Sequence, residues 1–478
     1  MVCCESLLLI LQICVLNIIT ERAPREDYYC YTNGALQLFH CYHAKSVQSK
    51  QHFQDVPCRF FAIIFDAGST GTRLHLYRYV HSTDQNELPF KVEEETFREV
   101  SPGLSSYSHN PAGASESIRS LIQIAHETIP PFMWDKTPIT LKATAGLRLL
   151  PGDMADDILD AVEREIVNSG FFAVPNGVGI MSGSDEGIYS WLTLNLLLNV
   201  FYSDDVKLPY FPDASRTVAA FDLGGGSTQL TFWPVDQRIF EHHSEYRRDI
   251  EFFGHRMQLF THSFLGNGLV AARLNTLLHI TGDEAEVKHE LSTPCMPSDF
   301  RLQDWEYALR KWTIRLGRFY IAGSNVLLVE LTLEGKMIYL FSYFFDRGLN
   351  AELVKEHSGG AVKLVDFKVA AEKACSRTKE ELRGSHWLPW LCHDLTYIYS
   401  LLYDGYGFGD TQPFYLAKKL KGMEVAWAQG LSYVLVDEFH RTHLSPVNRQ
   451  INDTVVGQIM SYIYSGTNNL LSYLNIIS

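Results

Sequence analysis

The chain has 478 residues, 46% of them hydrophobic and 13% aromatic, which is enough for two domains that each bury a core. Its 41 basic and 55 acidic residues give a formal net charge of −14, and this balance argues against a nucleic-acid scaffold. Phosphate ligands remain compatible with it, because backbone N–H groups and a metal ion bind phosphate without a basic surface.

The first feature along the chain is an apolar run from Leu7 to Ile19. It is too short to span a bilayer comfortably but long enough for the core of a signal peptide. No positive segment precedes it and no clear small-residue cleavage site follows, so a short signal anchor over residues 1–20 is the alternative. Both interpretations place the chain in the secretory pathway. The remaining alternative is that the run forms a buried helix of a cytosolic protein. The extension over 21–59 indicates no function.

Six of the nine cysteines follow this leader, without C-x-x-C or zinc-type spacing. Cys375 and Cys392 lie 17 residues apart around a loop of Gly, Ser, Trp and Pro residues, so we expect them to form a disulfide in an oxidising lumen. Asn452 begins the single N-glycosylation sequon, a short motif that often occurs by chance. The sequence leaves open the pairing of the remaining four, Cys30, Cys41, Cys58 and Cys295.

An apolar run over 60–65 predicts a buried strand that ends at Asp66 and enters the turn Ala-Gly-Ser-Thr-Gly-Thr-Arg73. Residues 74–80 then predict the second strand of a hairpin. A helix is expected over 114–128, where apolar residues recur at helical spacing before two prolines. A further strand over 139–144 opens into Ala-Gly-Leu-Arg148, from which Thr144 and Arg148 could reach a phosphate or its waters.

Residues 179–187 lead directly into an apolar helical segment, which places Asp185 and Glu186 in the first turn of a helix. The helix dipole favours carboxylates there, and Ser182 or Ser184 can cap the helix, so a purely structural role explains both acids. The functional alternative is that one carboxylate orients and deprotonates a water for attack on a phosphoryl group.

The apolar run 217–221 is followed by Asp222-Leu-Gly-Gly-Gly-Ser-Thr-Gln229. Three glycines allow a sharp turn with positive φ and leave no Cβ atom in the way of a ligand, and successive N–H groups in such a turn form a nest for phosphate. Ser227 and Thr228 add hydroxyl donors, while Asp222 could hold a divalent cation beside the phosphate.

The two turns repeat the order strand, Asp, Gly, Ser-Thr at an offset of 156 residues, about one domain. Facing each other across a cleft, they would bind a phosphate chain from both sides and share a water-mediated metal site. Kinases and ATPases of the actin and hexokinase type are built in this way. We therefore predict a two-lobed, duplicated α/β fold of the actin/hexokinase-like (ribonuclease H-like) type, with the active site in the interlobe cleft.

Four stretches in this order resemble the apyrase-conserved regions of the nucleoside triphosphate diphosphohydrolases, namely 66–73, 142–148, 183–187 and 222–229. A fifth region is similar at 339–346, and the resemblance covers roughly residues 60–438. Within that family, residues 261–273 and 391–397 resemble the short branch. Those members are secreted or reside in the Golgi and endoplasmic reticulum, and they prefer UDP and GDP.

The resemblance implies that Glu186 is the catalytic base and that Asp66 and Asp222 hold Ca²⁺ or Mg²⁺ through its waters, since hard cations prefer oxygen ligands. The nucleobase would lie between the lobes, stacked on Tyr343 or Tyr406, although a core position is an equal alternative for each ring. The implied phosphate contacts are Ser69, Thr70, Gly71, Gly224, Gly225, Gly226 and Ser227, with Thr144, Arg148 and Gln229 around the water and metal.

The resemblance also implies lobe I over 60–182, lobe II over 183–421 and a C-terminal helix over 422–438 that returns to lobe I, followed by an extension over 439–478. One departure concerns Cys295. In the short branch the matching cysteine pairs with another before the fifth region, but residues 322–336 contain none. We therefore expect either an unpaired Cys295 or a locally rebuilt segment.

The expected function is metal-dependent hydrolysis of UDP and GDP to the nucleoside monophosphate and phosphate, in the endoplasmic reticulum or Golgi lumen or outside the cell. The resemblance implies a role in glycosylation, because glycosyltransferases that use sugar nucleotides leave an inhibitory diphosphate. We expect a nucleotide as the binding partner, no nucleic acid, no obligate protein partner and at most one N-terminal membrane anchor. The alternatives are a broad tri- and diphosphate-hydrolysing apyrase, a sugar or glycerol kinase, and an inert nucleotide-binding protein.

Overall fold

The computed structural model describes residues 30–33, 38–41, 59–68, 70–81, 88–201, 213–282, 285, 288–297, 300–307, 310–316, 333, 335–355 and 359–443. The chain divides into a unit formed by residues 60–434 and a second unit formed by 1–59 and 435–478. In the second unit β1 (Cys30–Asn33) and β2 (Leu38–Cys41) pair antiparallel. The apolar leader and the sequon at Asn452 lie outside the described residues. Within the described ranges, no helix has the length and apolarity needed to cross a membrane.

The first sheet of the large unit has the strand order β5-β4-β3-β6-β7. Its central strands β3 and β6 run parallel, as do β6 and β7, while β4 and β5 pair antiparallel. Every residue of β3 except the first is buried, as expected for a strand covered on both faces. The strands are β3 (Arg59–Ala67), β4 (Thr72–His81), β5 (Phe90–Val100), β6 (Pro138–Ala143) and β7 (Phe172–Ile180).

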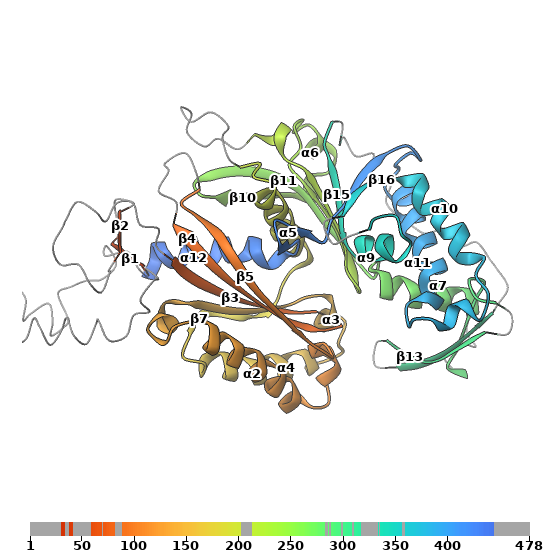
Figure 1. The fold of residues 1–478 in the computed structure, drawn as a ribbon, viewed down its shortest axis with the longest axis horizontal. Coiled ribbons are helices and arrows are strands. Elements are labelled where there is room, and N and C mark those ends of the chain that lie inside the picture. Colours follow the sequence, from red (N-terminus) through yellow and green to blue (C-terminus); the bar gives the residue numbers. More distant parts are fainter. Residues whose placement is uncertain are drawn as a thin grey trace, which may run out of the picture. The chain divides into compact units, whose positions relative to one another are not determined.

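Two long helices, α2 (Pro111–Thr128) and α4 (Met154–Val167), lie together on one side of this sheet (Figure 1). The predicted helix is confirmed: Asn110 caps α2, and the apolar residues recognised by their spacing are buried. Shorter turns are η1 (Leu104–Tyr107), η2 (Pro131–Lys136) and α3 (Ala145–Arg148).

The second sheet has seven strands in the order β10-β11-β9-β8-β15-β17-β16. Here β8, β15 and β17 are parallel neighbours, and the remaining pairings are antiparallel. The strands are β8 (Ala219–Leu223), β9 (Ser227–Phe232), β10 (Arg247–Phe252), β11 (His255–Leu265), β15 (Ile338–Ser342), β16 (Gly360–Lys363) and β17 (Pro413–Leu416).

The two sheets repeat one topology, which supports the prediction of a duplicated fold. In each, a buried strand (β3 or β8) has an aspartate as its next-to-last residue, the next strand in sequence (β4 or β9) lies on one side, and two parallel strands follow on the other side. Each sheet with its helices therefore forms one lobe of a mixed α/β, two-lobed molecule.

The helices of the second lobe pack against its sheet over a core that includes Phe221, Phe344 and Leu395. They are α5 (Gly183–Leu197), α6 (Ile239–His242), α7 (Leu269–Thr281), α9 (Tyr343–Asn350), α10 (Leu364–Cys375) and α11 (Leu388–Ser400), with the short turns η3 (Ala214–Arg216), η4 (Ser244–Tyr246), η5 (Glu381–Arg383) and η6 (Leu401–Gly405). Cys375 and Cys392 form a disulfide that joins α10 to α11, with an S–S distance of 2.05 Å.

A small mixed sheet consists of β12 (Glu290–Thr293), β13 (Arg301–Tyr307) and β14 (Arg310–Leu316). In it β14 pairs parallel with β12 and antiparallel with β13, and the sheet packs around Trp312 and Trp390. Cys295, which follows β12, carries a free thiol, and burial raises its pKa. Most of 322–336, the segment without a cysteine, lies outside the described residues.

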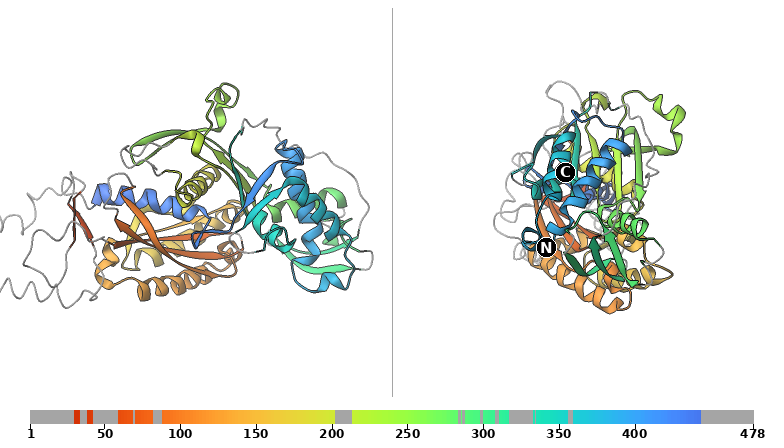
Figure 2. Two further views of the ribbon diagram at one scale, coloured as in Figure 1. Left: turned by 45° about the horizontal axis from the view of Figure 1, so that its top comes forward. Right: turned by 90° about the vertical axis from the view of Figure 1, so that its right-hand side faces the viewer.

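After β17 the chain forms the small hairpin β18 (Lys419–Leu420) and β19 (Met423–Glu424) and enters α12 (Trp427–His443). The last helix therefore begins at Trp427 and not near 422, because residues 419–424 pair as strands. Up to Val434, α12 contacts the first sheet (Figure 2): Ser432 Oγ lies 2.5 Å from Tyr79 Oη, and Val92 N donates to Tyr433 Oη at 3.1 Å.

Candidate active site

A cavity of about 410 Å³ lies where the carboxyl ends of the central strands of both lobes meet. Seven of the predicted phosphate, metal and catalytic residues line this cavity, and they belong to the two turns and the segments beside them. These residues are Asp66, Thr70, Thr144, Glu186, Asp222, Gly224 and Gly225. The structure therefore brings together residues that lie more than 150 positions apart in the chain. Ser69 lies outside the described residues.

The first turn is held by Arg73, which sequence reasoning did not assign. Its Nη1 donates to Asp66 Oδ2 at 3.1 Å, and its Nη2 lies 2.9 Å from Glu99 Oε1. Burial acts to lower the pKa of Arg73, but the charges of Asp66 and Glu99 outweigh it and raise this pKa. Gly71 does not face the cavity; its carbonyl accepts from Gly68 N at 3.0 Å and closes the turn.

The second turn is anchored by the N-terminus of α7. Leu269 N donates to Gly224 O, and Val270 N and Ala271 N donate to Gly225 O, at 2.9 to 3.0 Å. These bonds direct the carbonyl groups toward α7, and among the described residues Gly225 N and Gly226 N have no acceptor. The turn thus retains free N–H groups for an anion, as a phosphate nest requires.

The glycines of this turn are needed for close approach and not for a left-handed backbone. None of Gly224, Gly225 and Gly226 has positive φ. A Cβ atom on Gly226 would lie 2.8 Å from that of Ala145, and one on Gly268 would lie 2.3 Å from Ser227 N. The turn therefore packs against both α3 and the start of α7 with no room for a side chain.

Glu186 lies in the first turn of α5, which is capped by Ser182 through a bond from Asp185 N of 3.1 Å. Arg148 Nη2 donates to Glu186 Oε2 at 2.5 Å, and Gln229 Nε2 donates to the same oxygen at 3.1 Å. Oε1 receives no donor among the described residues. Burial raises the pKa of Glu186 to about 7, with Arg148 opposing this shift and Asp222 adding to it.

Gln229 also lies within hydrogen-bonding distance of Ser227 and Ser263, at 2.7 and 3.1 Å. Ser227 and Gln229 are almost fully buried, and they act behind the cavity surface by fixing Glu186. Arg148 is held in the same way, since its Nε donates to Met181 O at 3.0 Å. Ser263, from β11, was not predicted, because no motif marks it.

Asp66 and Asp222 form a donor set that suits a divalent cation. Both carboxylates are buried, and each has an Oδ1 atom without a hydrogen-bond partner. Burial raises the pKa of Asp222 to about 6, against hydrogen bonds from Ser342 and Ser190 that lower it. Two carboxylates opposite each other leave room for water and phosphate oxygens, as Mg²⁺ and Ca²⁺ prefer. No cluster of three or more His, Cys, Asp or Glu ligands occurs in the described ranges.

Ser342, at the end of β15, has φ of +57°, which is uncommon for a residue other than glycine. The strained position lies beside Asp222, where backbone strain is often kept for function. The sequence gives no signal for this conformation.

The two aromatic candidates differ in position. Tyr343 is half-buried and lines the cavity, so a base could stack on it. Tyr406 is 2% exposed and packs against Phe221 and Phe408 in the core of the second lobe. The structure therefore does not bring Tyr406 to the cleft, and the core alternative describes it.

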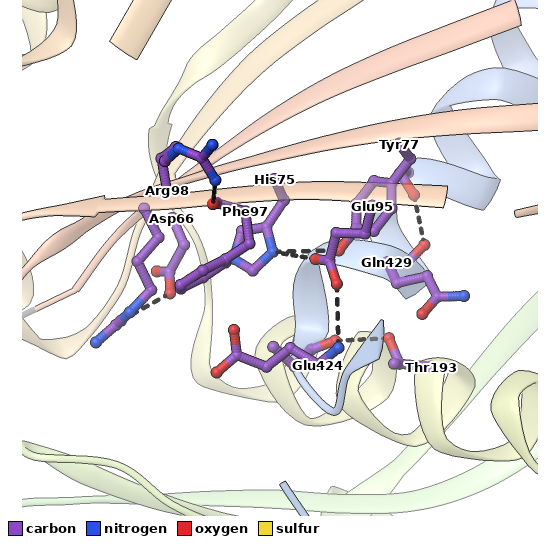
Figure 3. Close-up of polar contacts among 12 residues, drawn as sticks. Asp66, His75, Tyr77, Glu95, Phe97, Arg98, Thr193, Glu424 and Gln429 are labelled. Carbon is purple, nitrogen blue, oxygen red and sulfur yellow. Dashed lines mark hydrogen bonds and ion pairs between the residues drawn. The ribbon is translucent and has the colours of Figure 1, made fainter. Parts of the chain in front are cut away.

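Beneath Asp66, a buried pair of His75 and Glu95 joins the first sheet to the segment that precedes α12 (Figure 3). His75 Nδ1 lies 2.7 Å from Glu95 Oε1, and Glu424 N donates to Glu95 Oε2 at 3.1 Å. Burial acts to lower the pKa of His75, but the bond and charge of Glu95 raise it. Thr193 Oγ1 donates to Ala426 O at 2.7 Å and fixes the same segment to α5. Nothing in the sequence pattern pairs these residues.

Residues 55–310 and 321–451 match the GDA1/CD39 (nucleoside phosphatase) family. The chain belongs to this family. The nucleoside-diphosphatase uda-1 of Caenorhabditis elegans is 52% identical to it, with 99% of this chain and 98% of that protein covered. Human nucleoside diphosphate phosphatase ENTPD5 is 36% identical over 80% of this chain and 89% of its own length.

The fold agrees with membership of the GDA1/CD39 family. A crystal structure of nucleoside triphosphate hydrolases from Neospora caninum superposes with a TM-score of 0.51 at 13% identity, covering 81% of this chain and 94% of that one. At this low identity the likeness concerns the fold alone, and it supports the two-lobed architecture predicted from the repeated turns.

Proposed function

We propose that this member of the GDA1/CD39 family hydrolyses the terminal phosphate of nucleoside diphosphates, with UDP and GDP preferred, in a reaction that depends on Ca²⁺ or Mg²⁺. The observation that carries the proposal is the placement of Glu186, held by Arg148 and Gln229, in one cavity with two phosphate-type turns and two partly unpaired aspartates. The names of the relatives, a nucleoside-diphosphatase and a nucleoside diphosphate phosphatase, support the substrate class.

The turns bind the diphosphate from both lobes. Thr70 and Thr144 offer hydroxyl donors from the first lobe, and the N–H group of Gly225 offers a backbone donor from the second. Because these donors lie on the ends of rigid strands, they are oriented before the substrate arrives, which is how positioned dipoles favour a phosphoryl transition state.

Glu186 accepts a proton from the attacking water. Arg148 and Gln229 both bind Oε2, so the carboxylate is fixed with Oε1 available to a water. A raised pKa makes Glu186 a stronger base than a solvent-exposed glutamate while it remains ionised above about pH 7. Asp66 and Asp222 would hold the cation, which when bound polarises the terminal phosphoryl group and neutralises charge on the leaving oxygen.

The cellular setting is part of the proposal. The disulfide between Cys375 and Cys392 and the apolar leader support a lumenal or secreted enzyme. There it would remove the diphosphate released by glycosyltransferases. An activity assay on intact vesicles tests this: diphosphatase activity that appears only after the membrane is permeabilised supports a lumenal site, whereas full activity in sealed vesicles rules that role out.

The chemistry is tested by phosphate release from UDP, GDP, ADP and ATP in Ca²⁺, Mg²⁺ or EDTA, with Glu186→Gln as the variant. Losing one positioned base lowers kcat by about 10²- to 10⁴-fold. Asp185→Asn is a matched control, because it removes the neighbouring carboxylate of the same helix turn, which bonds to Ser182. A folded Glu186→Gln protein that retains full activity would exclude the mechanism, and faster release from ATP than from any diphosphate would favour a broad apyrase.

A further inference from the structure

An ion pair that lines the cavity has no part in the phosphate chemistry described above. Lys418 Nζ lies 3.2 Å from Asp346 Oδ1, and both side chains are 36% exposed. Both residues line the same cavity as Glu186 and the two turns. A half-exposed ion pair contributes little to stability, so its location in the cleft calls for another explanation.

The sheet places this pair one nucleotide length from the phosphate turn. Asp222 is the next-to-last residue of β8, Ser342 ends the adjacent parallel strand β15, and Lys418 follows the next parallel strand, β17. Neighbouring strands lie about 4.8 Å apart, so the ends of β8 and β17 are separated by roughly 10 Å. This separation suits a nucleoside diphosphate whose terminal phosphate lies at the end of β8 and whose base lies near the end of β17.

Tyr343 and Asp346 point to the same side of α9, because residues three apart lie on one face of a helix. Tyr343 packs over the guanidinium of Arg347 at 5.5 Å, which steadies one face of its ring. A base that contacts the Tyr343 ring would therefore present its edge to Asp346, with Lys418 beside it.

The pair offers a defined hydrogen-bonding pattern. An ionised carboxylate only accepts hydrogen bonds, and an ammonium group only donates them. Uracil and guanine each present a ring N–H next to a carbonyl, that is, a donor beside an acceptor. Cytosine and adenine present the reverse, a ring nitrogen acceptor next to an amino donor. The acceptor and donor of Asp346 and Lys418 match the first pattern and oppose the second.

We propose that Asp346 and Lys418 select the base by reading this edge: Asp346 accepts the N–H at N3 of uracil or N1 of guanine, and Lys418 donates to O4 or O6. The proposal rests on the proposed function and names its specificity-determining residues. It explains why a pyrimidine and a purine can share one site, since the two bases differ in size but have the same edge.

The first test compares kcat/KM for UDP, GDP, CDP and ADP between wild type and Asp346→Asn. Asparagine can donate as well as accept, so it accommodates the edges of cytosine and adenine. The ratio of UDP to CDP activity should fall by about tenfold to a hundredfold, the usual effect of one good base contact. The change should come mainly from improved CDP and ADP activity, with a smaller loss for UDP and GDP, because the asparagine oxygen still accepts but carries no charge.

The second test changes the substrate instead of the protein. N3-methyl-UDP lacks the donor that Asp346 would accept, so wild type should hydrolyse it about tenfold to a hundredfold less efficiently than UDP. Asp346→Asn should discriminate less between the two substrates. Lys418→Met should lower kcat/KM for UDP and GDP and leave the sensitivity to N3 methylation intact.

Asp249→Asn is the matched control, because Asp249 also pairs with a cation, Arg247, but lies exposed on β10 away from the cavity. It should leave all substrate ratios unchanged, and thermal unfolding shows whether each variant is folded. Wild-type activity that is equal on all four diphosphates, or on UDP and N3-methyl-UDP, overturns the base-reading proposal and leaves the diphosphatase intact. Absence of any metal-dependent diphosphatase activity in folded wild type overturns the proposed function itself.

Discussion

Glu186 and Arg148 show how the protein tunes a single residue. Arg148 brings a positive charge to 2.5 Å from a carboxylate whose pKa is raised by burial. The pKa of Glu186 near 7 is the result of burial, which raises it, and of Arg148, which lowers it. In the proposed mechanism, the arginine therefore positions the base and also sets the pH at which it becomes active.

This balance predicts the effect of Arg148→Met on the pH dependence. A base works when it is deprotonated, so kcat/KM declines as pH falls through the pKa of Glu186. Without the arginine that pKa rises, and the acid limb of the profile should move to higher pH by roughly 1 unit. Steady-state rates from pH 5 to 9 at a fixed cation concentration measure the shift. Arg119→Met, which removes an exposed arginine on α2, is the control and should leave the acid limb where it is. An acid limb that does not move in folded Arg148→Met would contradict its assignment to Glu186.

At the scale of elements, the strand ends carry the chemistry and the helices hold them. The first N–H groups of α7 bind the carbonyls of the second turn, and α7 is itself tied to α11 by Arg273 and Asp394, whose Nε to Oδ1 distance is 2.7 Å. Arg347 of α9 lies 3.6 Å from the same carboxylate, so one buried aspartate joins three helices. The second phosphate turn therefore depends on packing remote from the cleft.

Asp394→Asn should destabilise the protein in a pH-dependent manner. Burial acts to raise the pKa of Asp394, but Arg273, His393 and Arg347 hold it at about 2. This pKa lies below the value of about 3.9 that an aspartate has in the unfolded chain. The contribution of ionised Asp394 to the free energy of unfolding is therefore complete above about pH 4 and is lost as pH falls toward 2. Breaking one side of a buried pair costs about 3–5 kcal/mol near neutral pH.

Urea unfolding at pH 7, 4 and 3 measures this effect, and the difference between wild type and Asp394→Asn should shrink at the lowest pH. Asp236→Asn is the control, since it removes an exposed aspartate that also pairs with an arginine, Arg238, and it should change stability little. A constant difference at every pH would show that Asp394 acts through packing and not through its charge.

At the scale of the large unit, the site exists only because two lobes meet. Asp66 is the next-to-last residue of the central strand of one sheet and Asp222 that of the other, and both line the same cavity. Neither lobe alone offers both carboxylates and both turns. The segment before α12, fixed through Glu95 and Thr193, returns the chain to the first lobe and closes the floor of the cleft.

This shared site predicts coupled ligand binding. A non-hydrolysable UDP analogue and Mg²⁺ added together should raise the Tm by more than the sum of the Tm shifts that each causes alone. A ligand at about 100 times its Kd adds about 2.7 kcal/mol to the free energy of unfolding. Asp66→Asn and Asp222→Asn should each abolish the cation-dependent part, although they lie in different lobes. Thermal unfolding with and without EDTA provides the measurement. A variant in one lobe that leaves this part intact would show that the cation is bound by the other lobe alone.

Short stretches of sequence were enough to predict several local features: the strands that run into aspartates, the glycine turns, the helix over 114–128, observed as Pro111–Thr128, and the cap that places Glu186 in a first turn. These follow from short patterns whose physics is local, namely hydrophobic period, backbone freedom and capping. The repeat of one pattern about a domain apart was also enough to predict the duplicated fold.

The folded structure alone shows which side chains meet across strands and lobes. It buried Tyr406 and left Tyr343 in the cleft, paired Arg73 with Glu99 and His75 with Glu95, and placed Lys418 beside Asp346. Such contacts join residues on different strands or helices, and their partners depend on strand order and register, which a local pattern does not contain. The two turns that line the cavity could be predicted because they repeat a motif, whereas the pairing of Asp346 with Lys418 could not, because it depends on the adjacency of β8, β15 and β17.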